Sequence, residues 1–418
     1  MVDLMVIGQF GGSAGTVGVS TGGEIADMVT PIATAFSTAG QIYIAQLFGA
    51  KMYEKVKETT GTLITMMAMI ALTFMAITIL FCRPILGLLN CPEVAMSEAV
   101  NYMTITALGM PFIYGYNAVC GILRGIGESK RPLTFILVAA VVNIVLDVIL
   151  VAGFDMAASG TAIATVCAQF GSFMAAFLYM YKRRELFGFE LKPSYFKVRK
   201  DACKVILSLG LPQMGRAVMV RFSMLWLNSS INSFGLVASA TNSVGNKIQK
   251  FLEVFMLGLT QASGAMVGQN LGAKKQDRAS KTVWTTFLTC MGIATVMTTF
   301  AVLFPEQIFG IFTKDPEVLE FGKTYMKIMI IHFYLTGFHS SFLSMVVGSG
   351  FASLNFFQGM LDGIICRIGL AVLFAYVLDM GAVGLFLGAG VCRFFPGVLC
   401  CGYFLSGKWK TRKLLMEK

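Results

Sequence analysis

The chain has 418 residues, of which 56% are hydrophobic and 13% are charged, and its mean hydropathy is +0.73. This composition excludes a water-soluble globular domain, because hydrophobic runs of about 20 residues recur along nearly the whole chain. The net charge of +11 lies mainly between those runs, which is typical of a membrane protein and argues against a nucleic-acid partner.

Hydrophobic segments predict twelve membrane-spanning helices. The first segment is too short to cross a bilayer, because ten helical residues rise only about 15 Å. We therefore expect the first helix to be incomplete in this sequence, or to be completed by residues outside it. In chain order the segments cover residues 1–10, 17–48, 60–82, 99–122, 133–153, 158–181, 205–229, 236–269, 282–304, 321–347, 356–378 and 382–405.

Basic residues are distributed unevenly over the connecting segments. Most of the 33 Lys and Arg residues lie at 49–58, 124–132, 182–204, 274–281 and in the tail from Lys408, whereas the opposite loops contain only Arg83, Lys314 and Lys323. The positive-inside rule then places the C-terminus in the cytoplasm of a multi-pass cell-membrane protein. The predicted parts are an N-terminal lobe (1–182), a cytoplasmic linker (183–204), a C-terminal lobe (205–407) and a cytoplasmic tail (408–418).

The two lobes are internal repeats. Residues 18–51 align without gaps with residues 241–274, and both segments end in Gly-Ala-Lys. The same offset aligns Gly125 and Gly127 with Gly348 and Gly350. An even number of helices in each repeat predicts two parallel six-helix lobes around a central cleft, in an all-α membrane protein.

One stretch of the N-terminal lobe carries a concentrated polar signal. Asn143 and Asp147 are one helical turn apart in an apolar run, and after Gly153–Gly160 a second apolar helix carries Thr161 and Thr165. An ionised Asp near the centre of a bilayer costs roughly 2.5–3.5 kcal/mol and usually marks an ion or proton pathway. We interpret this hairpin as a cation site; the alternative is a structural Asn–Asp hydrogen bond between two helices.

Several motifs in a fixed order resemble the multidrug and toxic compound extrusion (MATE) transporters over essentially the whole chain. They are Val2-Asp3 with Gly8 and Phe10-Gly11, the Gln-x-x-Gly-Ala-Lys endings of 17–48 and 236–269, LRGIGESKRPL at 123–133, Asn143-x-x-x-Asp147, Gly160-Thr161-Ala162-x-Ala164-Thr165 and Leu211-Pro212. The resemblance implies cation-coupled antiport of amphipathic, often cationic, compounds. It also implies an N-lobe cation site at Asp3, Asn143, Asp147 and Thr165.

The C-terminal lobe departs from the family pattern. Val220 stands where some members have a Glu, and Thr336 and His339 lie near the position of an Asp in those members. The family's acidic C-lobe site is therefore not expected here. Instead, this lobe carries its own ionisable residues at membrane depth, for which we expect either a structural network or a polar wall that contacts substrate or relays protons through His339. They are Arg221, Glu253, His332, His339, Asp362, Arg367 and Arg393.

A second charged set lies near the predicted outer surface. Glu24 and Asp27 share one face of the segment 17–48, and Lys247 and Lys250 occupy the equivalent positions of 236–269. We predict either a charge latch that closes an outer gate or side chains that extend to the aqueous interface.

Together these patterns predict an antiporter that uses H⁺ or Na⁺ to export small amphipathic, often cationic, compounds by alternating access. The alternative is a related flippase or exporter of lipid-linked or anionic cargo. An enzyme is excluded, since the chain has two His and lacks HExxH, GxSxG and any close Cys/His set. We expect no cofactor, no metal apart from Na⁺, a lipid bilayer as the surroundings and a monomer.

Overall fold

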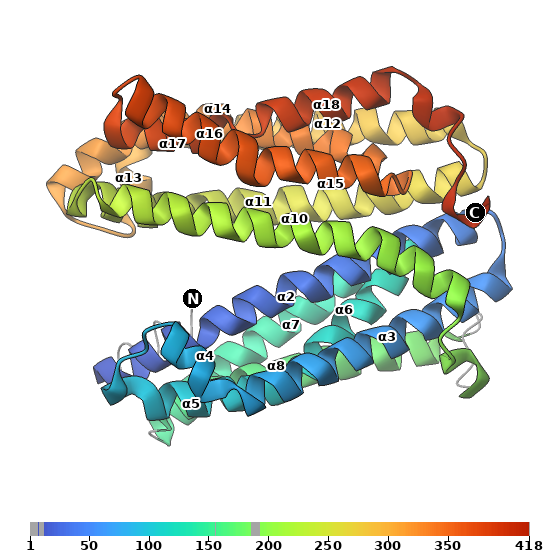
Figure 1. Ribbon diagram of the computed structural model, residues 1–418, viewed down its shortest axis with the longest axis horizontal. Helices are drawn as coiled ribbons and strands as arrows, with labels where there is room; N and C mark the ends of the chain where they lie inside the picture. The colour runs from blue at the N-terminus through green and yellow to red at the C-terminus, as the bar shows by residue number, and fades with distance from the viewer. Residues whose placement is uncertain (1–6, 8–11, 155, 185–192, 418) are drawn as a thin grey trace. The chain divides into compact units, whose positions relative to one another are not determined.

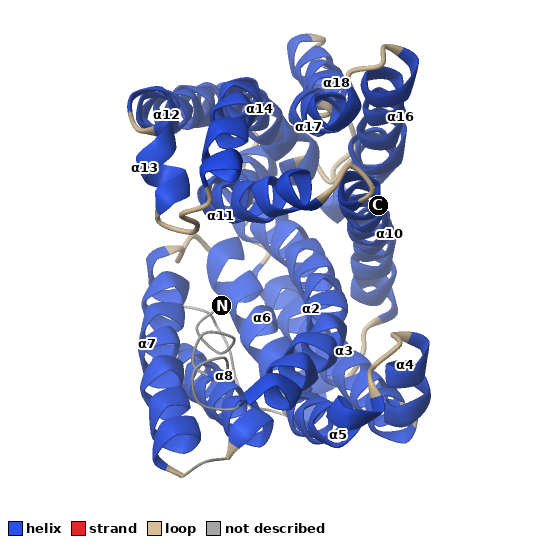
Figure 2. Cartoon of the chain, turned by 90° about the vertical axis from the view of Figure 1, so that its left-hand side faces the viewer, coloured by secondary structure: helices blue, strands red, loops and turns tan. Residues whose placement is uncertain are grey.

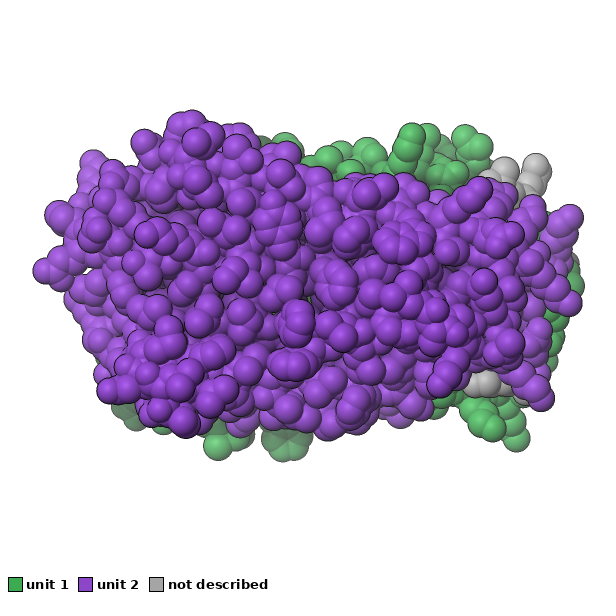
Figure 3. Space-filling view, turned by 90° about the horizontal axis from the view of Figure 1, so that it is seen from above, with its two compact units in different colours: residues 1–44, 52–210 green, residues 45–51, 211–418 purple. Residues whose placement is uncertain are grey.

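The structure is a computed structural model that describes residues 7, 12–154, 156–184 and 193–417. Every regular element in this part of the chain is a helix (Figures 1 and 2). The chain divides into two compact units, residues 1–44 with 52–210 and residues 45–51 with 211–418 (Figure 3). The last residues of the helix that ends at Gly49 thus belong to the second unit.

The first unit is built around α8, which packs against α5, α6 and α7. Gly109 separates α5 from α6, and Pro111 follows near the start of α6, where the missing N–H of proline has no helical partner to lose. The elements are α2 (Gly12–Gly49), α3 (Tyr53–Leu80), α4 (Cys82–Leu88), α5 (Glu93–Leu108), α6 (Met110–Gly125), α7 (Lys130–Asp147), η1 (Val148–Gly153), α8 (Ala157–Lys182) and η2 (Pro193–Phe196).

The second unit is built around α14, which packs against α11, α12, α17 and α18. Its elements are α10 (Lys200–Asn232, from Leu211 onward), α11 (Leu236–Gly272), α12 (Gln276–Leu303), α13 (Pro305–Gly310), α14 (Pro316–Gly348), α15 (Ala352–Met360), η3 (Leu361–Ile365), α16 (Cys366–Val372), η4 (Leu373–Val377), α17 (Gly381–Val391), α18 (Phe394–Leu405), η5 (Lys408–Lys410) and η6 (Leu415–Glu417).

The helices have the length and composition of membrane spans. Within the described residues, nine helical stretches are long and apolar enough to cross a bilayer, and every predicted segment from 17–48 onward coincides with helix. Continuous helix is the expected form, because the bilayer core offers no water to hydrogen-bond an open backbone. The prediction of an all-α membrane protein is confirmed. The predicted first helix lies outside the described residues, apart from Ile7.

The internal repeat has the same backbone geometry at matching positions. Lys51 follows α2 with φ 61°, and Lys274 follows α11 with φ 58°. Gly127 and Gly350, which also align, have φ 101° and 69°. These values lie in the left-handed region that commonly ends helices and that glycine adopts most easily. The two repeats therefore end their helices with the same chain reversals.

Two aligned glycines allow a close crossing in the second unit. A Cβ atom on Gly49 would overlap the carbonyl oxygen of Gln269, and a Cβ atom on Gly272 would overlap the carbonyl oxygen of Gln46. Each glycine thus packs on the glutamine of the other repeat, because the Gln-x-x-Gly motif occurs in both repeats. Small residues at these positions let the two backbones pack directly against each other.

The described part of the C-terminal tail, residues 408–417, is folded against the second unit. Trp409 is 2% exposed, and its Nε1 donates a hydrogen bond of 2.8 Å to the backbone oxygen of Phe404. Leu415 is also buried, and its backbone N–H donates a hydrogen bond of 2.9 Å to Oε1 of Gln46. The apolar side chains of a segment that is otherwise basic therefore attach the tail beside the end of α2.

Candidate functional site

Asp147 is buried, although most of the large side chains of its helix, α7, are exposed. The buried residues of α7 are Pro132 and Asp147, and Asp147 is 0% exposed. Most of the large apolar side chains of α7, such as Leu137 and Val141, are exposed and suited to lipid. The helix therefore turns its carboxylate inward and its apolar surface outward, which is the orientation expected of a functional acid in a membrane.

The side chains of Asn143 and Thr165 meet between α7 and α8. Nδ2 of Asn143 lies 3.4 Å from Oγ1 of Thr165 and donates a hydrogen bond to it. Thr161 points elsewhere, because its hydroxyl donates to the backbone oxygen of Ala158 at 2.8 Å. Of the four residues predicted for the cation site, Asp3 lies outside the described residues.

A change of helix type follows directly after Asp147. Residues 148–153 form the π-helical segment η1, and α8 begins four residues later, at Ala157. Single π turns occur often at functional sites because they shift the register of side chains along a helix. This π-helical segment is not predictable from the sequence, since an apolar run has the same composition in either helix type.

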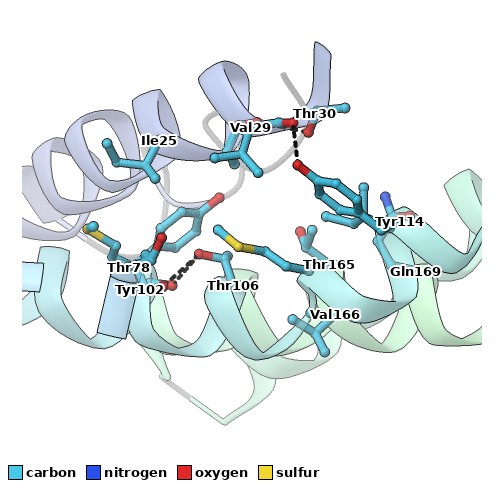
Figure 4. Close-up of a pocket in the computed structure, with 15 residues that line it drawn as sticks. Ile25, Val29, Thr30, Thr78, Tyr102, Thr106, Tyr114, Thr165, Val166 and Gln169 are labelled. Atoms are coloured by element: carbon cyan, nitrogen blue, oxygen red, sulfur yellow. Dashed lines mark hydrogen bonds between the residues drawn. The ribbon is translucent and has the colours of Figure 1, made fainter. Parts of the chain in front are cut away.

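Thr165 also lines a small cavity inside the first unit (Figure 4). The cavity measures about 50 Å³, which leaves room for a few waters. The hydroxyl of Tyr114 donates to the backbone oxygen of Val29 at 3.2 Å (Figure 4). The other polar side chains that line the cavity are those of Thr30, Thr78, Tyr102, Thr106 and Gln169.

The arrangement offers oxygen ligands of the kind that hard cations prefer. A carboxylate, an amide and a hydroxyl come from Asp147, Asn143 and Thr165, and Na⁺ and H⁺ both bind such oxygens. The carboxylate can also carry a proton in place of a metal ion. These are the ligand types that a site for a small cation needs, and their chemistry does not favour H⁺ over Na⁺.

A charged network lies in the second unit around Asp362, whose side chain is 1% exposed. Oδ1 of Asp362 lies 3.2 Å from Nη2 of Arg367 and 3.8 Å from Nε of Arg393. Oδ2 lies 3.5 Å from Nη2 of Arg216. One carboxylate on the π-helical segment η3 thus holds three guanidinium groups from α10, α16 and the junction of α17 with α18.

Arg393 links this network to Glu253 and to α14. Its Nη2 lies 2.6 Å from Oε1 of Glu253, and its Nη1 donates to Oγ1 of Thr336 at 2.9 Å. The hydroxyl of Thr336 lies 3.3 Å from Nε2 of His332. Most of the predicted C-lobe residues are therefore connected through Arg393 and Asp362.

His339 occupies a separate polar position on α14. Its Nε2 lies 2.9 Å from Oε1 of Gln358, and Nε2 of Gln358 donates to the backbone and side-chain oxygens of Asn355, both at 3.0 Å. His339, Gln358 and Asn355 are all buried. This second chain of hydrogen bonds ties α14 to α15.

The sequence matches the MatE family over residues 1–149 and 212–377. The chain belongs to the MatE family. Members of this family are transporters, so the chain is a multi-pass membrane transporter and not an enzyme.

Similar proteins agree with this assignment. The probable multidrug resistance protein YoeA of Bacillus subtilis is 26% identical over 346 residues, which cover 81% of this chain and 74% of YoeA. The probable multidrug resistance protein YpnP of the same organism is 24% identical over 418 residues, covering 100% of this chain and 92% of YpnP. A crystal structure of a Vibrio cholerae MATE transporter superposes with a TM-score of 0.89 at 22% identity, covering 99% of this chain and 93% of that one. The last likeness shows that the chain has the MATE fold.

The predicted gate residues of this MatE transporter are described only in part. Glu24 is half-buried on α2, and the side chain of Asp27 lies outside the described residues. Nζ of Lys247 lies 5.0 Å from the ring centroid of Phe312, a cation–π distance. Lys250 is exposed. The latch stays a prediction.

Two members of the C-lobe network were missing from the sequence analysis. Arg216 pairs with Asp362, and Gln358 bonds His339. Arg216 could have been predicted from the sequence, because it is a charged residue inside an apolar run, as Arg221 is. Arg221, which was predicted, is half-buried on α10. Gln358 offered no signal, because a single amide residue is common near helix ends.

Proposed function

We propose that this MatE transporter exports small amphipathic organic compounds in exchange for H⁺ or Na⁺. The names of its relatives support multidrug efflux, since YoeA and YpnP are each described as a probable multidrug resistance protein. Cation coupling is supported by the buried carboxylate of Asp147, which is one helical turn from Asn143 on α7, and by the hydrogen bond from Asn143 to Thr165.

The observation that carries the proposal is the burial of Asp147 on an otherwise exposed apolar helix. A carboxylate in a membrane span costs roughly 2.5–3.5 kcal/mol and usually marks an ion or proton pathway, which favours cation coupling at this position. A bound cation shifts the balance between two transporter conformations only by its difference in affinity for them. Asp147 provides such a difference if the site is accessible to water in one conformation and closed in the other.

The test is coupled efflux by the Asp147→Asn variant. Asparagine keeps the shape of the side chain and removes the charge, so cation binding is lost while folding is preserved. We expect ethidium efflux from reconstituted vesicles, driven by a pH gradient or by a Na⁺ gradient, to fall at least tenfold. The two gradients, applied separately, identify the coupling ion.

Glu93→Gln is the matched control, because Glu93 is an exposed acid in the first turn of α5. It should retain wild-type efflux. Membrane insertion and monodispersity of both variants are checked by size-exclusion chromatography. Full efflux by Asp147→Asn under either gradient would remove the basis of the proposal.

An exporter of anionic or lipid-linked cargo is the second candidate. It is supported by the three guanidinium groups of Arg216, Arg367 and Arg393, which outnumber the carboxylates of Glu253 and Asp362. A panel of cationic and anionic dyes in the same vesicle assay separates the two functions. The cytoplasmic location of the tail and the monomeric state are also proposed from the sequence.

A further inference from the structure

Among the described residues, the charged network of the second unit has an excess of positive charge. Its ion pairs join three guanidinium groups to two carboxylates, those of Glu253 and Asp362. Arginine remains protonated in proteins, so the charge of these three groups cannot be lost. An uncompensated charge away from water is costly, which makes an anionic counterpart favourable at this position.

The excess charge is most accessible at Arg216. The side chains of Arg367 and Arg393 are 4% and 12% exposed, whereas that of Arg216 is 31% exposed. Arg216 contacts Asp362 at 3.5 Å, which is longer than the 3.2 Å of Arg367 and shorter than the 3.8 Å of Arg393. Arg367 makes the shortest contact with Asp362, and the exposure of Arg216 leaves its charge available to a further ligand.

A second donor lies on the same face of α10. Gln213 precedes Arg216 by three residues, a spacing that places two side chains next to each other on a helix. Nε2 of Gln213 and Nε of Arg216 are both buried, and neither has a hydrogen-bond partner among the described residues. Unsatisfied buried donors are rare, because each costs about 1–3 kcal/mol.

The position of Arg216 is set by its neighbours on α15. A Cβ atom on Gly359 would lie 2.5 Å from Cγ and 2.7 Å from Cδ of Arg216. The stem of the arginine therefore packs directly on the backbone at Gly359, and its head is fixed by Asp362. A guanidinium held in this way is preorganised for a carboxylate or a phosphate group, which it can bind through two parallel hydrogen bonds.

We propose that Gln213 and Arg216 bind the carboxylate or phosphate group of an amphipathic compound carried by this transporter. Arg216 supplies charge and hydrogen bonds, Gln213 supplies an additional amide donor, and Asp362 with Gly359 holds Arg216 in place. The inference rests on the proposed transport function. It adds a class of cargo that bears an oxyanion, and it assigns the C-terminal lobe the recognition of that group.

The experiment measures binding of carboxyfluorescein to the full chain in lipid nanodiscs by fluorescence anisotropy, with ethidium as the cationic reference dye. We expect Arg216→Gln to weaken carboxyfluorescein binding at least tenfold and to change ethidium binding less than twofold. Gln213→Leu should weaken carboxyfluorescein binding by a smaller factor. Lys327→Gln removes an exposed positive charge from α14 and is the control, with no more than a twofold change for either dye.

If Arg216→Gln fails to fold, a second variant that keeps every charge can still test the site. Gly359→Ala should displace the stem of Arg216 and weaken carboxyfluorescein binding without altering ethidium binding. Competition identifies the anion: displacement by benzoate indicates a carboxylate ligand and displacement by phenyl phosphate a phosphate ligand, while benzamide, which is uncharged, should not compete. Equal competition by benzamide would overturn the proposal.

Other outcomes would also overturn it. Wild-type protein that does not bind carboxyfluorescein, Arg216→Gln protein that binds it normally, or equal losses for Arg216→Gln and Lys327→Gln each exclude the site. None of these results affects cation-coupled efflux of ethidium, which depends on Asp147. Failure of the anion site and failure of the proposed function are therefore distinguishable.

Discussion

Replacing Asp362 with Asn removes the carboxylate that faces three arginines while preserving the shape of the side chain. Asp362 is 1% exposed and lies within 4 Å of guanidinium nitrogens from Arg216, Arg367 and Arg393. Loss of one partner from a buried ion pair costs about 3–5 kcal/mol, because the remaining charge stays buried without compensation. The total stability of a folded domain is about 5–15 kcal/mol, so we expect a large effect.

Glu253→Gln is the internal comparison. The side chain of Glu253 is 29% exposed, and its one ion pair within the described part of the chain is with Arg393, at 2.6 Å. A hydrogen bond to a charged group contributes about 1.5–3 kcal/mol, and partial exposure lowers that figure. Asp362→Asn should therefore destabilise the protein more than Glu253→Gln.

Thermal unfolding in detergent, followed by tryptophan fluorescence, measures both effects. A change of 1 kcal/mol shifts the midpoint by about 2–4 °C in a domain of this size, so Asp362→Asn should lower it by on the order of 10 °C. The double variant Asp362→Asn with Arg367→Gln should recover part of the loss, because it also removes one buried charge. A shift no larger than that of Glu253→Gln, or no recovery in the double variant, would refute the reasoning.

Two further predictions concern packing in the second unit. Trp409→Ala should destabilise the protein by about 3–5 kcal/mol by emptying a buried site under the tail, whereas Lys413→Ala, at an exposed position, should leave the melting temperature unchanged. Gly272→Ala should lower the melting temperature, because its Cβ would overlap a neighbouring carbonyl oxygen; at Gly292 a Cβ meets no atom within 4 Å, and the same change should be neutral or stabilising by up to about 1 kcal/mol. Equal melting curves for Trp409→Ala and Lys413→Ala would contradict the packing of the tail, and equal curves for the two glycine variants would contradict the close helix crossing at Gly272.

The sequence by itself determined the helices and their repetition. A hydrophobic run in a bilayer has to form hydrogen bonds within itself, so its composition is enough to predict a helix, and each run from 17–48 onward is helical. The repeat predicted equivalent positions, and Lys51 and Lys274 share one backbone conformation. Asn143 and Thr165 were also predicted to lie together, and they form a hydrogen bond.

Only the tertiary structure decided which charges meet. Arg216 and Asp362 are separated by 146 residues, and no local pattern connects positions so far apart. The attachment of the tail through Trp409, and the π-helical segments that contain Asp362 or follow Asp147, were likewise unpredicted. The physical reason is that hydrophobicity and helix periodicity are local properties of a chain, whereas the partner of a buried charge is set by how distant helices pack.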